Sequence, residues 1–250
     1  MNYLLTLSFD GKGFCGWQYQ PNARTVQGVI SDASNKIFKC PCLVTGCSRT
    51  DSGVHELGFV CTVKPTEDVP AIDCEKIPLA YSALLPEDVS VLGARVVDDD
   101  FHPRYRTLTK EYEYRIFNSK IGDPFLVDRA YRFPHKISEQ GIEDMQRAAE
   151  HIVGTHDFAS FMASGSKITD CVRTVKFCRV RKEGDMIYIN IAADGFLYNM
   201  VRIIAGTLLD VAVGKTLPDD MKNIIEARDR TRAGGTATPA GLYLKEVIYE

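Results

Sequence analysis

Apolar and polar positions in the first hundred residues switch between the two-residue period of strands and the 3.6-residue period of helices. Thr25 is a candidate N-cap for a helix whose apolar positions run from Val26 to Ile37. The predicted elements, in order, are a strand over 2–10, that helix, strands over 42–45 and 54–63, a helix over 73–83, and a strand over 89–97. This order is the split βαβ pattern of ferredoxin-like folds.

The rest of the chain repeats the order. The predicted elements are a strand over 107–117, a helix over 138–153 ended by Gly154, strands over 172–180 and 186–193, a helix over 196–211, a short helix near 219–227, and a strand over 242–249. No Pro/Gly/Ser-rich linker separates the halves. We therefore expect an α+β fold of two ferredoxin-like halves, residues 1–105 and 106–250, forming a mixed, mostly antiparallel sheet flanked by helices, with a central cleft.

Composition is that of an ordinary globular protein, with 45% apolar and 25% charged residues in a chain of 250. The apolar stretch from Tyr3 to Phe9 is interrupted by Thr6 and Ser8, so it is too short and polar for a membrane span or a signal peptide. We expect a cytoplasmic protein without a membrane partner.

Cysteine and glycine spacing argues against a metal or a nucleotide cofactor. Eight cysteines without an export signal indicate reduced thiols, and Cys40-Pro41-Cys42 has the wrong spacing for zinc. The segment from Asp10 to Gly13 lacks the spacing of a phosphate-binding loop, and no serine lies in a nucleophile elbow. We expect neither metal nor cofactor.

The net charge of -3 differs from the basic balance usual for nucleic-acid-binding domains. Binding to RNA would need charge gathered locally, and basic residues do cluster in the sequence, although each cluster alone is more typical of a solvated face. The clusters are Arg104, Arg106, Lys110 and Arg115; Arg173, Lys176, Arg179, Arg181 and Lys182; and Arg228, Arg230 and Arg232.

The most unusual loop is Gly46 to Gly53, which lies between two predicted strands. It holds Arg49 and Asp51 together with two serines and a threonine. Loops on a rigid scaffold often carry function. A plain turn is the local alternative, because Asp51-Ser52-Gly53 is good turn sequence.

Arg202 lies in the middle of a predicted helix that is apolar around nearly its whole circumference, so the helix is expected to be buried. Its one stripe of smaller or polar residues comprises Gly195, Asn199, Arg202 and Gly206, along which another chain segment can approach closely. A buried arginine needs a carboxylate or carbonyls, and that partner could be catalytic or structural.

Strand alternation places Tyr112 and Tyr114 on one face and Glu111, Glu113 and Arg115 on the other. Two tyrosines on one face of a sheet can be ordinary packing. They can also stack on an RNA base, as in RNA-binding sheets of this topology.

These segments together resemble the tRNA pseudouridine synthase A family. The decapeptide from Gly46 to His55 is similar to the family's signature loop, and other similar segments follow in the family's order over essentially the whole chain. They are Asp10-Gly11, Phe14 to Gln18, Phe101 to Arg104, Lys110 to Tyr114, His156 to Phe158, Phe196 to Gly206, and Pro239 to Leu244.

The resemblance implies a pseudouridine synthase fold and a homodimer that isomerises uridine to pseudouridine in the anticodon arm of tRNA, at positions 38, 39 and 40, without a cofactor. It implies that Asp51 is the essential carboxylate and Arg202 its partner, that Tyr112 packs on the target base, and that Arg49 holds the base out of the stack. Leu244 is implied as a further substrate-binding residue.

Two routes are open for Asp51, which could attack the sugar as a nucleophile or remove a ribose proton as a base. Two other functions also fit parts of the pattern. A non-catalytic RNA-binding protein would bind tRNA without depending on Asp51, and a nucleosidase would release free uracil.

Overall fold

The computed structural model describes residues 1–166 and 168–249, which divide into two compact units. Unit 1 comprises Met1–Leu108 together with Leu244–Glu250, and unit 2 comprises Thr109–Tyr243. The last strand, β10 (Leu242–Tyr249), therefore begins in unit 2 and continues in unit 1. The expected division at residues 105 and 106 and the expected central cleft between the halves stay predictions.

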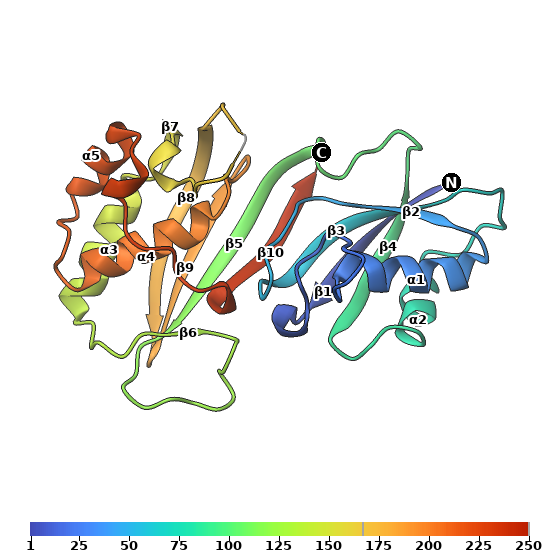
Figure 1. Ribbon diagram of the computed structural model, residues 1–250, viewed down its shortest axis with the longest axis horizontal. Helices are drawn as coiled ribbons and strands as arrows, with labels where there is room; N and C mark the ends of the chain where they lie inside the picture. The colour runs from blue at the N-terminus through green and yellow to red at the C-terminus, as the bar shows by residue number, and fades with distance from the viewer. Residues whose placement is uncertain (167, 250) are drawn as a thin grey trace. The chain divides into compact units, whose positions relative to one another are not determined.

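Unit 1 has the ferredoxin-like order of elements (Figure 1). Its elements are β1 (Asn2–Phe9), α1 (Val26–Phe38), β2 (Cys42–Gly46), β3 (His55–Pro65), α2 (Ile77–Ser82) and β4 (Val89–Val97). The strands lie in the order β4-β1-β3, with β2 paired to β3, and all three pairings are antiparallel. Strand β10 is the further neighbour of β3.

Side-chain pattern explains the unit 1 elements. Thr25 caps α1 as expected, because its hydroxyl accepts a hydrogen bond of 3.3 Å from the backbone N–H of Gly28. Leu5, Leu7 and Phe59 are at most 1% exposed and form the core with residues of α1 and α2. Helix α2 is shorter than the predicted 73–83, since the backbone N–H of Lys76 bonds to Asp73 O in a separate turn.

Unit 2 repeats the element order with additions. Its elements are β5 (Thr107–Phe117), β6 (Tyr131–Arg132), α3 (Glu139–Glu150), β7 (Gly154–Asp157), β8 (Val172–Glu183), β9 (Met186–Ala193), α4 (Met200–Ala212) and α5 (Asp220–Ala227). The strands lie in the order β5-β9-β8-β7 with antiparallel pairings, while β6 pairs parallel to β5. Short 3₁₀ helices occur in both units, at Gly11–Gly13, Ala159–Phe161, Arg230–Arg232 and Pro239–Gly241.

Two unit 2 helices show where the pattern was right and where it was wrong. Helix α3 begins after Ser138, whose hydroxyl accepts a 3.0 Å hydrogen bond from Gly141 N, as the sequence predicts. Helix α4 begins at Met200 and not at residue 196, because Asn199 has a left-handed backbone with φ of 60°.

The expected α+β class with a mixed, mostly antiparallel sheet is confirmed.

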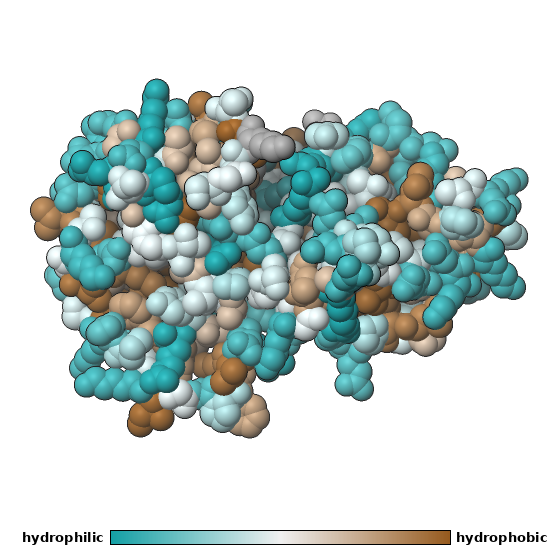
Figure 2. Space-filling view, viewed as in Figure 1, coloured by the Kyte–Doolittle hydropathy of each residue, from teal (hydrophilic) through white to brown (hydrophobic). Residues whose placement is uncertain are grey.

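Hydrophobic residues on the visible face form separate patches among hydrophilic ones (Figure 2). One patch lies at the loop between β5 and β6, where Ile121, Phe125 and Val127 are 80%, 82% and 54% exposed. No helix of the described ranges 1–166 and 168–249 is long and apolar enough to cross a membrane.

Candidate active site

The loop between β2 and β3 carries Asp51 at a tight turn. The backbone N–H of Val54 donates to Asp51 O at 3.3 Å, and Gly53 has a positive φ of 80° that its missing side chain permits. Before the turn, Cys47 N donates to Val60 O at 2.9 Å, so the loop leaves β2 still attached to β3. Asp51 is half-buried and Arg49 is exposed.

A second segment, residues 10–18, braces this loop within unit 1. Gly16 has a φ of 79°, and a Cβ there would lie 2.3 Å from Thr50 O. A Cβ on Gly11 would lie 1.9 Å from Val54 O, and the Ser52 hydroxyl donates to Phe14 O at 3.1 Å. The backbone on both sides of Asp51 is therefore held by close packing that only glycine permits. Sequence reasoning missed this bracing, although Gly11 and Gly16 were its visible signal.

Buried polar contacts fix the end of the loop where β3 begins. His55 is 2% exposed, and its Nδ1 accepts a hydrogen bond of 3.1 Å from Gly11 N and lies 3.1 Å from Asp10 Oδ1. Asp10 Oδ1 also accepts a hydrogen bond of 3.0 Å from Lys12 N. This network ties the start of β3, just after Asp51 in the chain, to the segment that follows β1.

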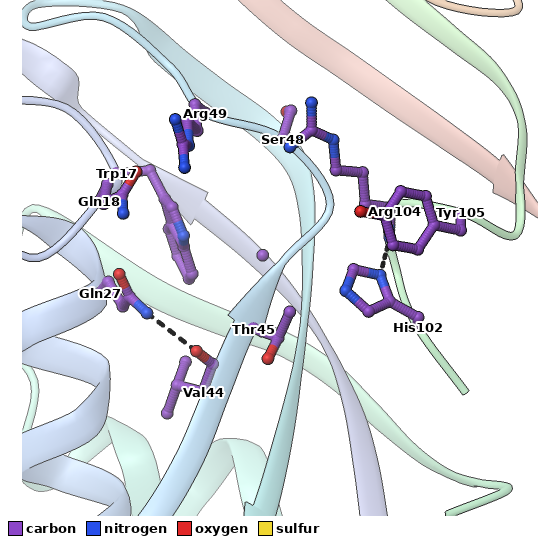
Figure 3. Close-up of a pocket in the computed structure, with 11 residues that line it drawn as sticks. Trp17, Gln18, Gln27, Val44, Thr45, Ser48, Arg49, His102, Arg104 and Tyr105 are labelled. Atoms are coloured by element: carbon purple, nitrogen blue, oxygen red, sulfur yellow. Dashed lines mark hydrogen bonds between the residues drawn. The ribbon is translucent and has the colours of Figure 1, made fainter. Parts of the chain in front are cut away.

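A pocket of about 230 Å³ opens beside the loop (Figure 3). Its walls come from three segments of unit 1, with Gln27 at one side. The lining residues of these segments are Trp17 and Gln18; Val44, Thr45, Gly46, Ser48 and Arg49; and His102, Arg104 and Tyr105. Gln27 is positioned by α1, and its Nε2 donates to Val44 O at 2.9 Å. No aspartate or glutamate lines this pocket. Its polar groups therefore suit a neutral or anionic ligand.

Tyr112 lies on β5 of unit 2, opposite Ile191 of β9. It is 8% exposed, and its ring meets that of Phe196 edge-on, with centroids 5.1 Å apart. Tyr114 is fully buried, and its hydroxyl donates to Thr238 O at 2.7 Å. Burial raises the pKa of Tyr114 well above its ordinary value, so its hydroxyl stays protonated. The packing interpretation is right for Tyr114.

The opposite face of β5 carries charges, as strand alternation predicts. Arg115 Nε donates to Glu113 Oε1 at 2.8 Å, and Asn190 Nδ2 donates to Glu111 and to Glu113 at 3.2 and 3.3 Å. This charged network belongs to the sheet face away from Tyr112.

The side chain of Arg202 extends from α4 along the predicted stripe of smaller or polar residues. Its Nε donates to Ala237 O at 2.8 Å, and its Nη1 donates to Asn199 Oδ1 at 2.7 Å. One turn further on, a Cβ on Gly206 would lie 1.9 Å from Gly235 O. The predicted close approach of another segment is confirmed, and the segment is 234–237.

The expected site residues fall in both units. Arg49 and Asp51 share one loop of unit 1, and Leu244, with a fully buried side chain, lies on the part of β10 that belongs to unit 1. Tyr112 and Arg202 belong to unit 2. The pairing of Asp51 with Arg202 joins the two units and stays a prediction, as do the substrate roles of Arg49, Tyr112 and Leu244.

No group of three or more His, Cys, Asp or Glu side chains in the described part of the chain could hold a metal ion. None of the eight cysteines, all of which lie in the described part of the chain, forms a disulfide. Burial raises the pKa of Cys42 and of Cys178 to about 12, so these thiols stay protonated and are poor metal ligands.

Known proteins resemble this chain over its whole length. A family model described as tRNA pseudouridine synthase matches residues 148–250. The tRNA pseudouridine synthase A of Caldicellulosiruptor saccharolyticus is 46% identical over 99% of both chains, that of Thermoanaerobacter sp. is 44% identical over 99% of both, and that of Bacillus subtilis is 42% identical over all of both. The chain belongs to the tRNA pseudouridine synthase A family. The family expected from the sequence is confirmed.

Proposed function

We propose that this protein isomerises uridine to pseudouridine in tRNA, with Asp51 as the catalytic carboxylate. The observation that carries the proposal is the intact signature loop, in a chain that is similar to named synthases over its whole length. Gly11 and Gly16 pack closely against the backbone of this loop on both sides of Asp51. A carboxylate held in this way can act on a bound nucleotide with little reorganisation.

The reaction breaks the N-glycosidic bond, turns the uracil and joins its C5 to the ribose, without net redox change or hydrolysis. No cofactor is needed for these steps. Asp51 acts either as nucleophile on the sugar or as base toward a ribose proton. We assign Arg202 as the partner of Asp51, because a guanidinium is a bidentate donor that matches a carboxylate.

The other proposed roles follow from side-chain chemistry. Tyr112 presents an aromatic ring to the uracil, and the ring of Phe196 packs against it in a T-shaped arrangement. Arg49, which is exposed on the loop, enters the space left in the RNA when the target nucleotide leaves the stack. Leu244 contributes an apolar contact beside the base.

The proposed substrate is the anticodon arm of tRNA, at positions 38, 39 and 40, bound by a homodimer in the cytoplasm. The resemblance to the family supports these finer points. A uridine near a stem end costs less to unstack than one in the middle of a helix, so the arm is a favourable place for this chemistry.

Tritium release from transcribed tRNA labelled at uridine C5 tests the reaction, because C5 loses its hydrogen when it bonds to the ribose. We expect release by the wild type and none by Asp51→Asn, which keeps size and hydrogen bonding but removes the charge. Asp68→Asn is the matched control, because Asp68 is exposed and lies outside the loop. It should release tritium at the wild-type rate.

Loss of release in Asp51→Asn with tRNA binding retained would support the proposal. Binding by the wild type with no release from any tRNA would overturn it in favour of a non-catalytic RNA-binding protein. Release of free uracil would overturn it in favour of a nucleosidase.

A further inference from the structure

The pocket beside the signature loop is separate from the carboxylate that does the chemistry. Asp51 is not among the lining residues, whereas Ser48 and Arg49, just before it in the loop, are. A volume of about 230 Å³ is below the roughly 300 Å³ at which pockets for drug-sized ligands begin. The pocket therefore suits one small group, such as a nucleobase with its phosphate at the rim.

Trp17 supplies the first sign of a ligand. Its side chain is 3% exposed and is fixed by Phe59, with ring centroids 4.3 Å apart, and by Gly46, where a Cβ would lie 2.5 Å from Trp17 Nε1. An indole N–H is a donor only, and buried tryptophans usually give it an acceptor. Among the described residues no acceptor takes this hydrogen bond, and Trp17 is one of the residues that line the pocket (Figure 3).

Two arginines at the pocket supply the second sign. Arg49 and Arg104 are both exposed, and within residues 1–166 and 168–249 neither guanidinium pairs with a carboxylate. Other arginines of the basic clusters are engaged, such as Arg106 with Asp100 at 3.3 Å. Free guanidinium groups beside a donor-only indole favour an occupant rich in oxygen acceptors.

Tyr105 supplies the third sign. It is 78% exposed at the pocket wall, and its ring lies against that of His102, with centroids 4.3 Å apart and planes 32° apart (Figure 3). An exposed aromatic ring held by a second ring, next to unpaired arginines, is the combination that binds unstacked nucleotides.

We propose that this pocket is a binding subsite for one unstacked nucleotide of the substrate RNA other than the target uridine. Trp17 Nε1 donates to a base carbonyl or phosphate oxygen, the base stacks on Tyr105, and Arg104 contacts the phosphate. This assignment rests on the proposed function, because it takes tRNA as the ligand. It adds a second contact that orients the RNA while Asp51 acts on the target.

Trp17 is the single tryptophan of the chain, so its fluorescence reports directly on the pocket. The probe is a transcribed anticodon-arm hairpin, titrated into the full chain carrying Asp51→Asn so that no reaction intervenes. We expect the hairpin to change Trp17 emission, and Tyr105→Ala to weaken hairpin affinity by about tenfold, the scale of one base–aromatic stack. Phe125→Ala is the matched control, since Phe125 is 82% exposed and far from these segments in sequence.

A scan with abasic nucleotides identifies the bound base. Each position except the target is made abasic in turn, and the affinity of each hairpin is measured for the Asp51→Asn chain with and without Tyr105→Ala. We expect one position where loss of the base weakens binding about tenfold in the presence of Tyr105 and has no effect in its absence.

Equal effects of each abasic position with and without Tyr105, or affinity unchanged by both Tyr105→Ala and Arg104→Gln, would overturn the subsite. Neither outcome touches the proposed function, which fails only if the wild type releases no tritium from tRNA.

Discussion

Arg202 and Tyr114 in unit 2 donate hydrogen bonds to partners of their own unit, whereas two side chains at the pocket in unit 1, Trp17 and Arg104, have no hydrogen-bond partner among the described residues. Arg202 donates to Ala237 O and Asn199 Oδ1, and Tyr114 donates to Thr238 O. At the pocket, Trp17 and Arg104 have no such side-chain partner in the part of the chain that the structure describes. A satisfied polar group contributes to the fold, while an unsatisfied one at an open pocket is available to a ligand. Substitutions that break the contacts at Ala237 and Thr238 should therefore affect mainly stability, whereas substitutions of Arg104 and Tyr105 at the pocket should affect mainly RNA binding.

Both regions nevertheless use the same packing device. Gly16 in unit 1 and Gly206 in unit 2 each let a backbone carbonyl come closer than any side chain would allow. The same substitution at these two positions therefore tests the comparison directly, since the functional consequence should differ while the steric conflict is alike.

The largest effect is expected from Gly16→Ala on the reaction rate. The new Cβ would lie 2.3 Å from Thr50 O, and the φ of 79° disfavours alanine, so the loop that carries Asp51 must shift. A displacement of about 1 Å at a reacting group costs on the order of 100-fold in rate. The rate of tritium release under single-turnover conditions measures this loss.

Gly93→Ala is the control for this substitution, because nothing lies within 4 Å of its Cβ position. It should react at the wild-type rate. A Gly16→Ala protein that is folded and as fast as the wild type would show that the bracing of Asp51 is not needed.

Gly206→Ala should destabilise unit 2 by about 3 kcal/mol, the upper range for overpacking a fitted site. A Cβ at this position would lie 1.9 Å from Gly235 O, which is backbone and cannot rotate away. The midpoint of urea unfolding measures the loss. A wild-type midpoint would show that segment 234–237 moves aside at no cost, and Arg202 would then lose its fixed support at Ala237.

Much of the fold was predictable from the sequence because local signals and packing agree. The bounds of β4, β5, β9 and β10 match the predicted strands, and Thr25 and Ser138 are the expected caps. Strands β6 and β7 were missed. Strand β6 has only two residues, and β7, Gly154–Asp157, is short and polar, so neither shows an apolar period.

The candidate site was predictable only where it carries unusual residues. Asp51 and Arg202 stood out by charge in a glycine-rich loop and in an apolar helix. The pocket did not, because Trp17, Gly46 and Tyr105 come from three separate segments and have no common spacing. Their meeting depends on the pairing of β2 with β3 and on the turn after β4, which no local pattern encodes.

Of the substitutions predicted here, the smallest effect is expected for Glu113→Gln, on the charged face of β5 in unit 2. Desolvation would raise its pKa, but hydrogen bonds and charge from Arg115, with Asn190 and Arg181, outweigh burial and hold that pKa below its ordinary value of 4.5. Glu113→Gln should therefore cost about 2 kcal/mol of unfolding free energy at neutral pH, as for other charged groups that lose buried partners.

The contribution of Glu113 to the free energy of unfolding depends on pH with a definite sign. Because the folded state lowers the pKa of Glu113, its contribution is fully present above 4.5 and is lost as the pH falls through the lower folded value. Urea unfolding of wild type and Glu113→Gln over a pH series should show a gap at neutral pH that narrows in acid. If Glu113→Gln weakened RNA binding while leaving the unfolding free energy unchanged, the contrast between this self-satisfied network on β5 and the ligand-facing pocket of unit 1 would fail, because the network would then serve the substrate.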